Sequence, residues 1–335
     1  VALESLGKTP PRKRPCKDID IAAILKGLPS PVCVPERHRF RALWPFVPVW
    51  KGMTWLARRL QRGKTERAFV VVGGLVNGGA GRTPAAAWLA EQLTDAHVIS
   101  AGYRRQDSGP NIRTGHPAKP PIHDLGDELE MIRRRGLAVT SAPNRMQAIN
   151  QMPTHCLPII DGGLGDPRLQ NGFRIACIDG QTPLGRGPFP VGHRRLPWST
   201  LRQVNAIWIT NAVTDMRFAP LPPGVPVVRS MMRPAGWIHR GKLYPLDAVR
   251  GSVDVVVGIA NPDRFVCVLS DLGLHIRNLR VTGDHDPLGP VGPDTVLTEK
   301  DAARLPIDAD VWALRMELDV DGGESLLQQI VEHSA

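Results

Sequence analysis

Residues 68–93, "AFVVVGGLVNGGAGRTPAAAWLAEQL", decide the fold class of this chain. The β-branched apolar run at the start predicts a buried strand, and the alanine-rich run after Pro84 predicts a helix. A glycine-rich turn lies between them. A strand that leads through such a turn into a helix is typical of α/β proteins with a phosphate-binding loop.

The turn itself, "GGAGRTP" at 78–84, matches such a loop only in part. Thr83 stands where a hydroxyl would ligate Mg²⁺, but the pattern G-x-x-x-x-G-K-[ST] fails at Val76 and at Arg82, which replaces the lysine. Glycines let backbone N–H groups come close to a phosphate; here these are Gly78, Gly79 and Gly81. The pattern alone leaves open a plain strand-to-helix turn that uses glycine for tightness.

The rest of the chain alternates short β-branched runs with helical runs. This alternation predicts an α/β fold, a P-loop NTPase-like, mostly parallel sheet flanked by helices. The further predicted strands span 97–100, 137–141, 156–161, 173–179, 204–210 and 254–260. The further predicted helices span 125–136, 145–152 and 262–273. A Gly-, Pro- and Arg-rich loop at 181–200 is expected to carry function.

Four segments are predicted along the chain. They are a loosely ordered basic extension at 1–40, an amphipathic helix at 41–66, a nucleotide-binding lobe at 67–200 and a smaller C-terminal α/β lobe at 201–335. In the amphipathic helix, one face carries Val49, Met53, Leu56 and Leu60, and the other carries Lys51, Arg58, Arg59 and Arg62. Such a helix fits either a membrane interface or a packing position with solvated arginines.

The formal net charge of +10 favours an anionic partner, whether nucleic acid, acidic membrane or phosphorylated substrate. No nucleic acid partner is expected, because helix-turn-helix, zinc and base-stacking motifs are lacking. Cys156, Cys177 and Cys267 lie in apolar runs and are predicted to be buried, reduced thiols, which suits a cytosolic compartment. No apolar run is long enough to predict a transmembrane helix.

Three titratable residues outside the loop are candidates for chemistry. Asp161 ends an apolar strand, where an acid beside a phosphate loop commonly holds Mg²⁺ but also forms turns. Asp127 lies at a predicted helix start, where an acid also suits the helix dipole. His285 lies in the turn-like stretch "TGDHDP" and is either solvated or, paired with an aspartate, a proton acceptor for a sugar hydroxyl.

Taken in order, these segments resemble the tetraacyldisaccharide 4'-kinase family. "VVVGGLVNGGAGRTP" is similar to V-V-G-N-hydrophobic-T-V-G-G-T-G-K-T-P, "VISAGYRR" to I-S-R-G-Y-G-R, and "LGDELEMIRRRG" to G-D-E-P-x-hydrophobic-hydrophobic. "PIIDGGLGDPRL" is similar to hydrophobic-D-D-G-L-Q-H, and "FPVGHRR" to P-A-G-P-L-R-E. "GIANPDRF", "GDHDP" and "VLTEKDAARL" resemble G-I-G-N-P-E-R-F, P-D-H-H-P and M-T-E-K-D-A. The series runs from about residue 41 to residue 332.

The resemblance implies a membrane-associated P-loop kinase with two α/β/α lobes. Such a kinase uses Mg²⁺ to move the γ-phosphate of ATP to the 4' hydroxyl of a tetraacyldisaccharide 1-phosphate, the lipid A precursor. The product is lipid IVA, in lipid A biosynthesis. The enzyme works as a peripheral protein at the cytoplasmic face of the bacterial inner membrane, so this resemblance favours the membrane-interface interpretation of the amphipathic helix.

The resemblance also implies roles for residues that match the family's motifs. Asp127 and His285 match its catalytic pair. The nucleotide-binding positions are Gly78, Gly79, Gly81, Arg82 and Thr83. The metal positions are Thr83 and Asp161, and the substrate-binding positions are Glu128 and Arg195.

The chain departs from the family pattern at several of these motifs. Arg82 replaces the loop lysine, Gly162 replaces the second acid of the metal-associated pair, and Gly74 replaces an asparagine. The other departures are Ala101, Asp166, His193 and Leu196. Because positioning and charge supply most of phosphoryl-transfer catalysis, two interpretations remain: a working kinase, and an inactive member that retains nucleotide or lipid binding. Asp166 is a candidate replacement acid.

Overall fold

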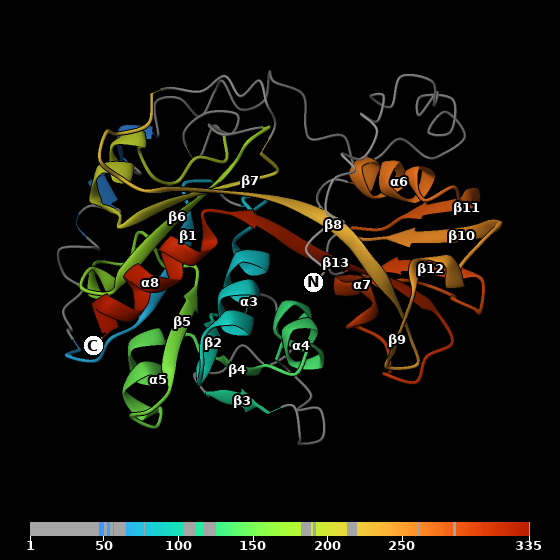
Figure 1. The fold of residues 1–335 in the computed structure, drawn as a ribbon, viewed down its shortest axis with the longest axis horizontal. Helices are drawn as coiled ribbons and strands as arrows, with labels where there is room; N and C mark the ends of the chain where they lie inside the picture. The colour runs from blue at the N-terminus through green and yellow to red at the C-terminus, as the bar shows by residue number, and fades with distance from the viewer. Residues whose placement is uncertain are drawn as a thin grey trace, which may run out of the picture.

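The computed structural model describes residues 65–76, 78–102, 112–116, 125–181, 189, 192–212, 220–259, 262–283 and 286–334, and residues 47–49, 52, 53 and 56. Within these residues the strands form one sheet of 13 (Figure 1). Its order is β11-β10-β12-β13-β8-β7-β6-β1-β5-β2-β4-β3, with β9 paired to β8. Most neighbours are parallel; β3–β4, β8–β13 and β8–β9 are antiparallel.

The first half of the sheet surrounds β1. Its strands are β1 (Val70–Gly74), β2 (Ala96–Ser100), β3 (Arg113–Gly115), β4 (Ala138–Ser141), β5 (Leu157–Asp161), β6 (Phe173–Asp179) and β7 (Ala206–Thr210). Its helices are α3 (Arg82–Gln92), α4 (Asp127–Arg134) and α5 (Arg145–Gln151), with short 3-10 turns η2 (Pro167–Leu169) and η3 (Trp198–Gln203). β1 lies between β5 and β6 in parallel register, so the glycine-rich turn leaves the carboxyl edge at the middle of this half.

The second half continues the same sheet. Its strands are β8 (Val227–His239), β9 (Lys242–Tyr244), β10 (Ser252–Val257), β11 (His275–Val281), β12 (Thr295–Thr298) and β13 (Trp312–Asp321). Its helical segments are η4 (Leu246–Ala248), α6 (Pro262–Asp271), α7 (Glu299–Ala302) and α8 (Gly323–Ser334). The long antiparallel pair β8–β13 runs from one half into the other, as Figure 1 shows.

Five apolar cores are found among the described residues, and two of them pack helices on the two halves of the sheet. The first packs α3 and α4 on the central strands around the buried Trp208, and it includes Leu326 and Ile330 of α8. The C-terminal helix therefore returns to the first half of the sheet. The second core packs α6 on the parallel strands of the second half, around Trp237 and Phe265. Burial of such apolar side chains is the dominant favourable contribution to folding.

The predicted fold class is confirmed, because the sheet is largely parallel and flanked by helices. The division into lobes at 67–200 and 201–335 stays a prediction; β7 and α8 both lie with the first half. Burial is found for Cys177, whereas Cys156 and Cys267 are only half-buried, so the prediction of three buried thiols is wrong for two. Cys156 lies just before β5, whereas Cys267 lies in the middle of α6, and solvent reaches part of each side chain.

Most of the predicted amphipathic helix, and the whole of 1–40, lie outside the described residues. Within the helix, the described residues Val49, Met53 and Leu56 are helical and are 57%, 62% and 52% exposed. These three share the predicted apolar face. No described helix is long and apolar enough to cross a membrane.

Candidate active site

The turn after β1 has a backbone suited to binding an anion. Gly78, Gly79 and Gly81 all have left-handed backbone angles, with φ of 76°, 70° and 68°. Gly81 directly precedes α3, and no side chain caps the first N–H groups of this helix. A Cβ on Gly81 would lie 2.6 Å from Cγ2 of Thr210, so glycine is required there for packing as well. The turn thus presents uncapped backbone donors at a helix N-terminus.

Thr83 and Asp161 meet beside this turn. The Thr83 hydroxyl donates to Oδ2 of Asp161 at 2.7 Å, and the other oxygen of Asp161 is buried without a hydrogen-bond partner. Burial raises the pKa of the Asp161 carboxyl, while the charge of Arg82 acts in the opposite direction. An orphaned buried carboxylate oxygen beside a hydroxyl fits a hard cation such as Mg²⁺. No cluster of three or more His, Cys, Asp or Glu side chains exists among the described residues, so the remaining ligands would be phosphate oxygens and water.

Asp127 begins α4 and is buried, and its Oδ1 accepts from the backbone N–H of Glu128 at 2.9 Å. α4 leads directly into β4, which runs parallel to β2 and β5, so the start of α4 lies at the carboxyl edge of the sheet, where β5 also ends. Asp127, Glu128 and the glycine-rich turn therefore gather around the carboxyl edge of the sheet. Parallel sheets bind their ligands at this edge.

Lys300 is the residue that sequence reasoning missed. Its Nζ lies 3.4 Å from Oε1 of Glu128 and 3.9 Å from Oδ2 of Asp127. Lys300 lies on α7, in the "TEKDA" segment, and comes to α4 from the other half of the sheet. The motif was visible in the sequence, but nothing in it indicated which residue it would contact.

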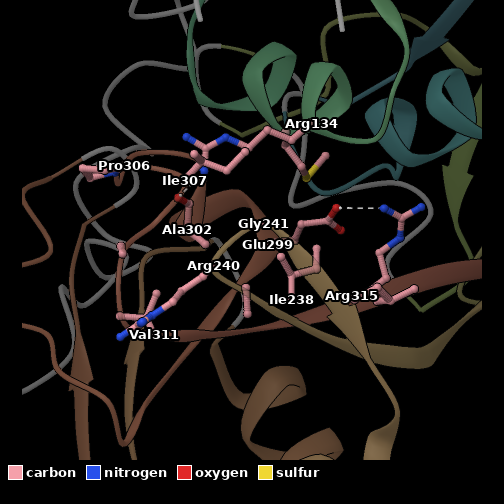
Figure 2. Close-up of a pocket in the computed structure, with 14 residues that line it drawn as sticks. Arg134, Ile238, Arg240, Gly241, Glu299, Ala302, Pro306, Ile307, Val311 and Arg315 are labelled. Carbon is pink, nitrogen blue, oxygen red and sulfur yellow. Dashed lines mark hydrogen bonds and ion pairs between the residues drawn. The ribbon is translucent and has the colours of Figure 1, made fainter. Parts of the chain in front are cut away.

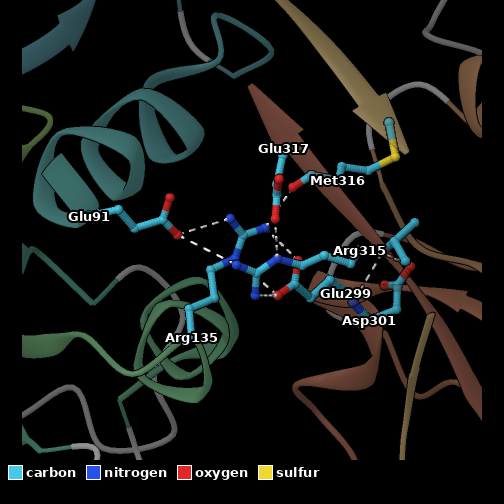
Figure 3. A network of polar contacts seen from close by, with 8 residues as sticks. Glu91, Arg135, Glu299, Asp301, Arg315, Met316 and Glu317 are labelled. Atoms are coloured by element: carbon cyan, nitrogen blue, oxygen red, sulfur yellow. Dashed lines mark hydrogen bonds and ion pairs between the residues drawn. The ribbon is translucent and has the colours of Figure 1, made fainter. Parts of the chain in front are cut away.

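The other charged residues of this segment hold α7 in place (Figure 3). Glu299 pairs with Arg135, the residue that follows α4, and with Arg315 of β13. Both guanidinium groups also lie 3.6 Å from Oε1 of Glu91 in α3. Asp301 accepts from the N–H of Gly258 and from the Thr298 hydroxyl, and it pairs with Arg304. Separating such a buried ion pair would leave an uncompensated charge, which is unfavourable, so these contacts hold α7 in its position. They fix Lys300 against α4.

His285 lies outside the described residues. Its neighbour Asp286 is held by Arg304, whose Nη1 donates to the Asp286 carbonyl at 2.8 Å. Arg195 is exposed; its backbone N–H donates to the Leu75 carbonyl at 2.8 Å, which sets its segment beside the start of the glycine-rich turn. Asp166 does not replace the missing acid, because both its oxygens accept from Arg168.

The family model for LpxK, tetraacyldisaccharide-1-P 4'-kinase, matches residues 39–334. The chain belongs to this family. A tetraacyldisaccharide 4'-kinase of Hamiltonella defensa is 30% identical over 304 residues, which cover 80% of this chain and 89% of the relative. Another, of Methylorubrum populi, is 31% identical over 328 residues, which cover 88% of this chain and 95% of the relative.

A solved structure shows the fold of the family. The crystal structure of the "apo" form of LpxK from Aquifex aeolicus in complex with ATP matches with a TM-score of 0.74 and 21% identity. The match covers 88% of this chain and 99% of that one. This LpxK family member therefore shares the fold of that protein across both halves of the sheet.

Figure 2 shows a separate cavity, which no described residue of the glycine-rich turn lines. Its volume is about 180 Å³, and its walls include Met131 and Arg134 of α4 and Ile238 of β8. Arg134 donates to the carbonyls of Ala302 and Leu305. The cavity thus lies beside the contact between α4 and α7 and opens to solvent at Leu243 and Ile307. None of the predicted site residues of this LpxK family member lines it.

Lys300→Met is expected to lower kcat by about 10- to 100-fold, because the cation that orients the two carboxylates is lost. Steady-state kinetics at saturating ATP and acceptor measures this loss. Lys300→Arg should recover part of kcat, and Lys242→Met, at an exposed lysine of β9, should leave kcat unchanged. An unchanged kcat in Lys300→Met would reduce Lys300 to a packing residue.

Proposed function

We propose that this chain is an ATP-dependent kinase that phosphorylates the 4' hydroxyl of tetraacyldisaccharide 1-phosphate, forming lipid IVA in lipid A biosynthesis. One observation carries the proposal. Asp161 accepts a hydrogen bond from the Thr83 hydroxyl of the glycine-rich turn, at the same carboxyl edge of the sheet at which α4 begins. A triphosphate on the turn would therefore face the acids of α4, where an acceptor hydroxyl has to lie.

ATP is proposed to bind at the turn through the backbone N–H groups around Gly78, Gly79 and Gly81 and through the side chains of Arg82 and Thr83. Thr83 and Asp161 would hold Mg²⁺. When bound there, Mg²⁺ supplies positive charge that neutralises the phosphate oxygens. The uncapped helix start and the orphaned oxygen of Asp161 support this assignment.

Asp127 and His285 are proposed as the catalytic pair. The acceptor's 4' oxygen forms a bond to the γ-phosphorus while the bond from that phosphorus to the β–γ bridging oxygen breaks. The hydroxyl proton passes to the His285 imidazole, and the Asp127 carboxylate stabilises the resulting charge. Glu128 and Arg195 are proposed to contact the disaccharide phosphate region, and Lys300 keeps Glu128 and Asp127 in position.

The membrane surface is proposed as the place of the reaction, at the cytoplasmic face of the inner membrane. Val49, Met53 and Leu56 support it, because these three large apolar side chains, which the sequence pattern assigns to one helical face, are more than half exposed. An interfacial helix buries such a face among lipid headgroups and acyl chains. Its basic residues would lie toward anionic headgroups.

A second candidate is an inactive family member that binds nucleotide or lipid without turnover. Two observations favour it: Arg82 in place of lysine, and Gly162 in place of an acid. Transfer from γ-labelled ATP to the disaccharide 1-phosphate by purified protein in detergent distinguishes the two. We expect labelled lipid product. Binding of ATP without any product, at high concentration of folded protein, would favour the second candidate.

A further inference from the structure

We propose that Gly74 and Gly162 form the slot that lets Arg82 act as the phosphate-binding cation, so that these three departures from the family pattern form one matched set. This inference rests on the proposed ATP site. The three residues come from the end of β1, the start of α3 and the turn after β5. Nothing in the sequence brings them together, but the fold places the Arg82 side chain between the two glycines.

The walls of the slot are defined by what a side chain would meet there. A Cβ on Gly162 would lie 3.2 Å from Nη1 of Arg82 and 3.5 Å from Nη2 of Arg145. A Cβ on Gly74 would lie 3.4 Å from Cδ of Arg82 and 3.0 Å from Cβ of Ala80. The stem of Arg82 therefore passes Gly74, and its guanidinium lies against Gly162. A planar guanidinium needs more width than an ammonium group, and glycine at 162 supplies it.

The charges around the slot also indicate that Arg82 binds phosphate. Within the described part of the chain, the Arg82 guanidinium has no hydrogen bond or ion pair, and the Nε of Arg145 is buried without a partner. An acid at 162 would stand between these two guanidiniums and pair with both. With glycine there, their donors are left for a ligand, and two converging guanidiniums bind a polyphosphate in the bidentate way that arginine favours.

Gly162 is also required by its backbone conformation. Its φ is 89°, and its N–H donates to the Val72 carbonyl at 2.7 Å, so the turn is fixed to β1 in a conformation that side chains rarely adopt. Gly136, at the end of α4, has nearly the same φ of 88° but would meet nothing within 4 Å. Gly136→Ala is therefore a matched control: it carries the same unfavourable backbone angle as Gly162→Ala, but its Cβ meets no neighbouring side chain.

The test measures the Kd for ATP with Mg²⁺ by titration calorimetry on the full chain in detergent. Arg82→Lys is expected to weaken binding about 10-fold, because bidentate contacts are lost. Gly162→Ala should weaken it about 10-fold by displacing the guanidinium, and Gly162→Asp by about 100-fold by also capturing its charge. Gly136→Ala should leave Kd unchanged while lowering the melting temperature as Gly162→Ala does.

The deciding variant is the double replacement R82K/G162D. We expect its Kd to lie within about 3-fold of that of R82K alone, since a lysine leaves room for the acid. Equal penalties for G162D with arginine or lysine at 82 would overturn the matched set. If G162D does not fold, the same comparison is made with G162A. If the wild-type protein binds ATP but the affinity losses of R82K and G162D add up in the double variant, only this inference is contradicted. If the wild-type protein binds no ATP, the proposed function is contradicted too.

Discussion

Asp127→Asn is expected to lower kcat by about 10² to 10⁴-fold, the range that a general-base function contributes. The carboxylate is buried, lies 3.9 Å from Lys300 and is proposed to stabilise the charge that forms on His285. Asparagine keeps its size and its hydrogen bond from the Glu128 N–H but carries no charge. Binding of ATP should change little, because Asp127 acts on the acceptor side. Initial rates at saturating ATP and acceptor, with Kd for ATP measured separately, check both statements.

Two variants control this experiment. Asp247→Asn removes an exposed carboxylate that pairs with Arg250 far from the turn, and it should leave kcat unchanged. His285→Ala should lose a similar factor to Asp127→Asn, and the double variant should lose little more, because residues that act as a unit are not additive. Near-normal turnover of Asp127→Asn would remove this residue from the catalytic pair.

Asp161→Asn is expected to lower kcat by about 10² to 10³-fold and to raise the Mg²⁺ concentration needed for half-maximal rate. Burial raises the pKa of this carboxyl, so its ionised form is less favourable in the folded protein than in the unfolded chain. Neutral asparagine removes that cost at pH 7, and the melting temperature without ATP and Mg²⁺ should not fall. The Asp161→Asn variant is thus predicted to lose activity without losing stability.

Asp179→Asn is the matched control for this variant. Asp179 ends the neighbouring strand β6 and is also buried, but Asn211 and Arg264 already bind its two oxygens. Its replacement should lower stability while leaving the Mg²⁺ requirement unchanged. A normal Mg²⁺ requirement in Asp161→Asn would contradict the placement of the metal at Thr83 and Asp161.

The sequence predicted the elements whose signal is local. The valine run of β1, the alanine-rich helix after it and the parallel strands that follow each carry a clear periodicity, and all were found. The long strand β8 was missed, because Pro234 and Gly236 interrupt its pattern. Its partner β13 pairs with it antiparallel around an irregular register at Arg315 and Met316. Such pairing depends on tertiary packing, which local propensity does not encode.

The site was predictable where a motif carried it and not where the fold assembled it. Gly81 and Thr83 were identified from the glycine-rich loop pattern and Asp161 from its position at a strand end, and they do gather at one edge of the sheet. Lys300 was not, since its contact with Glu128 comes from the docking of α7 on α4. Likewise, the sequence shows Arg82 and Gly162 as the loss of a lysine and the loss of an acid at two distant positions, whereas the structure places the two residues side by side.

The most direct test of the account is whether the purified chain phosphorylates the 4' hydroxyl of tetraacyldisaccharide 1-phosphate. The acceptor and its 4'-deoxy analogue are each incubated with ATP and Mg²⁺, and the lipids are analysed by mass spectrometry. The account predicts the gain of one phosphoryl group on the acceptor and none on the analogue, despite arginine at 82 and glycine at 162. Phosphorylation of both lipids, or of neither, would contradict it.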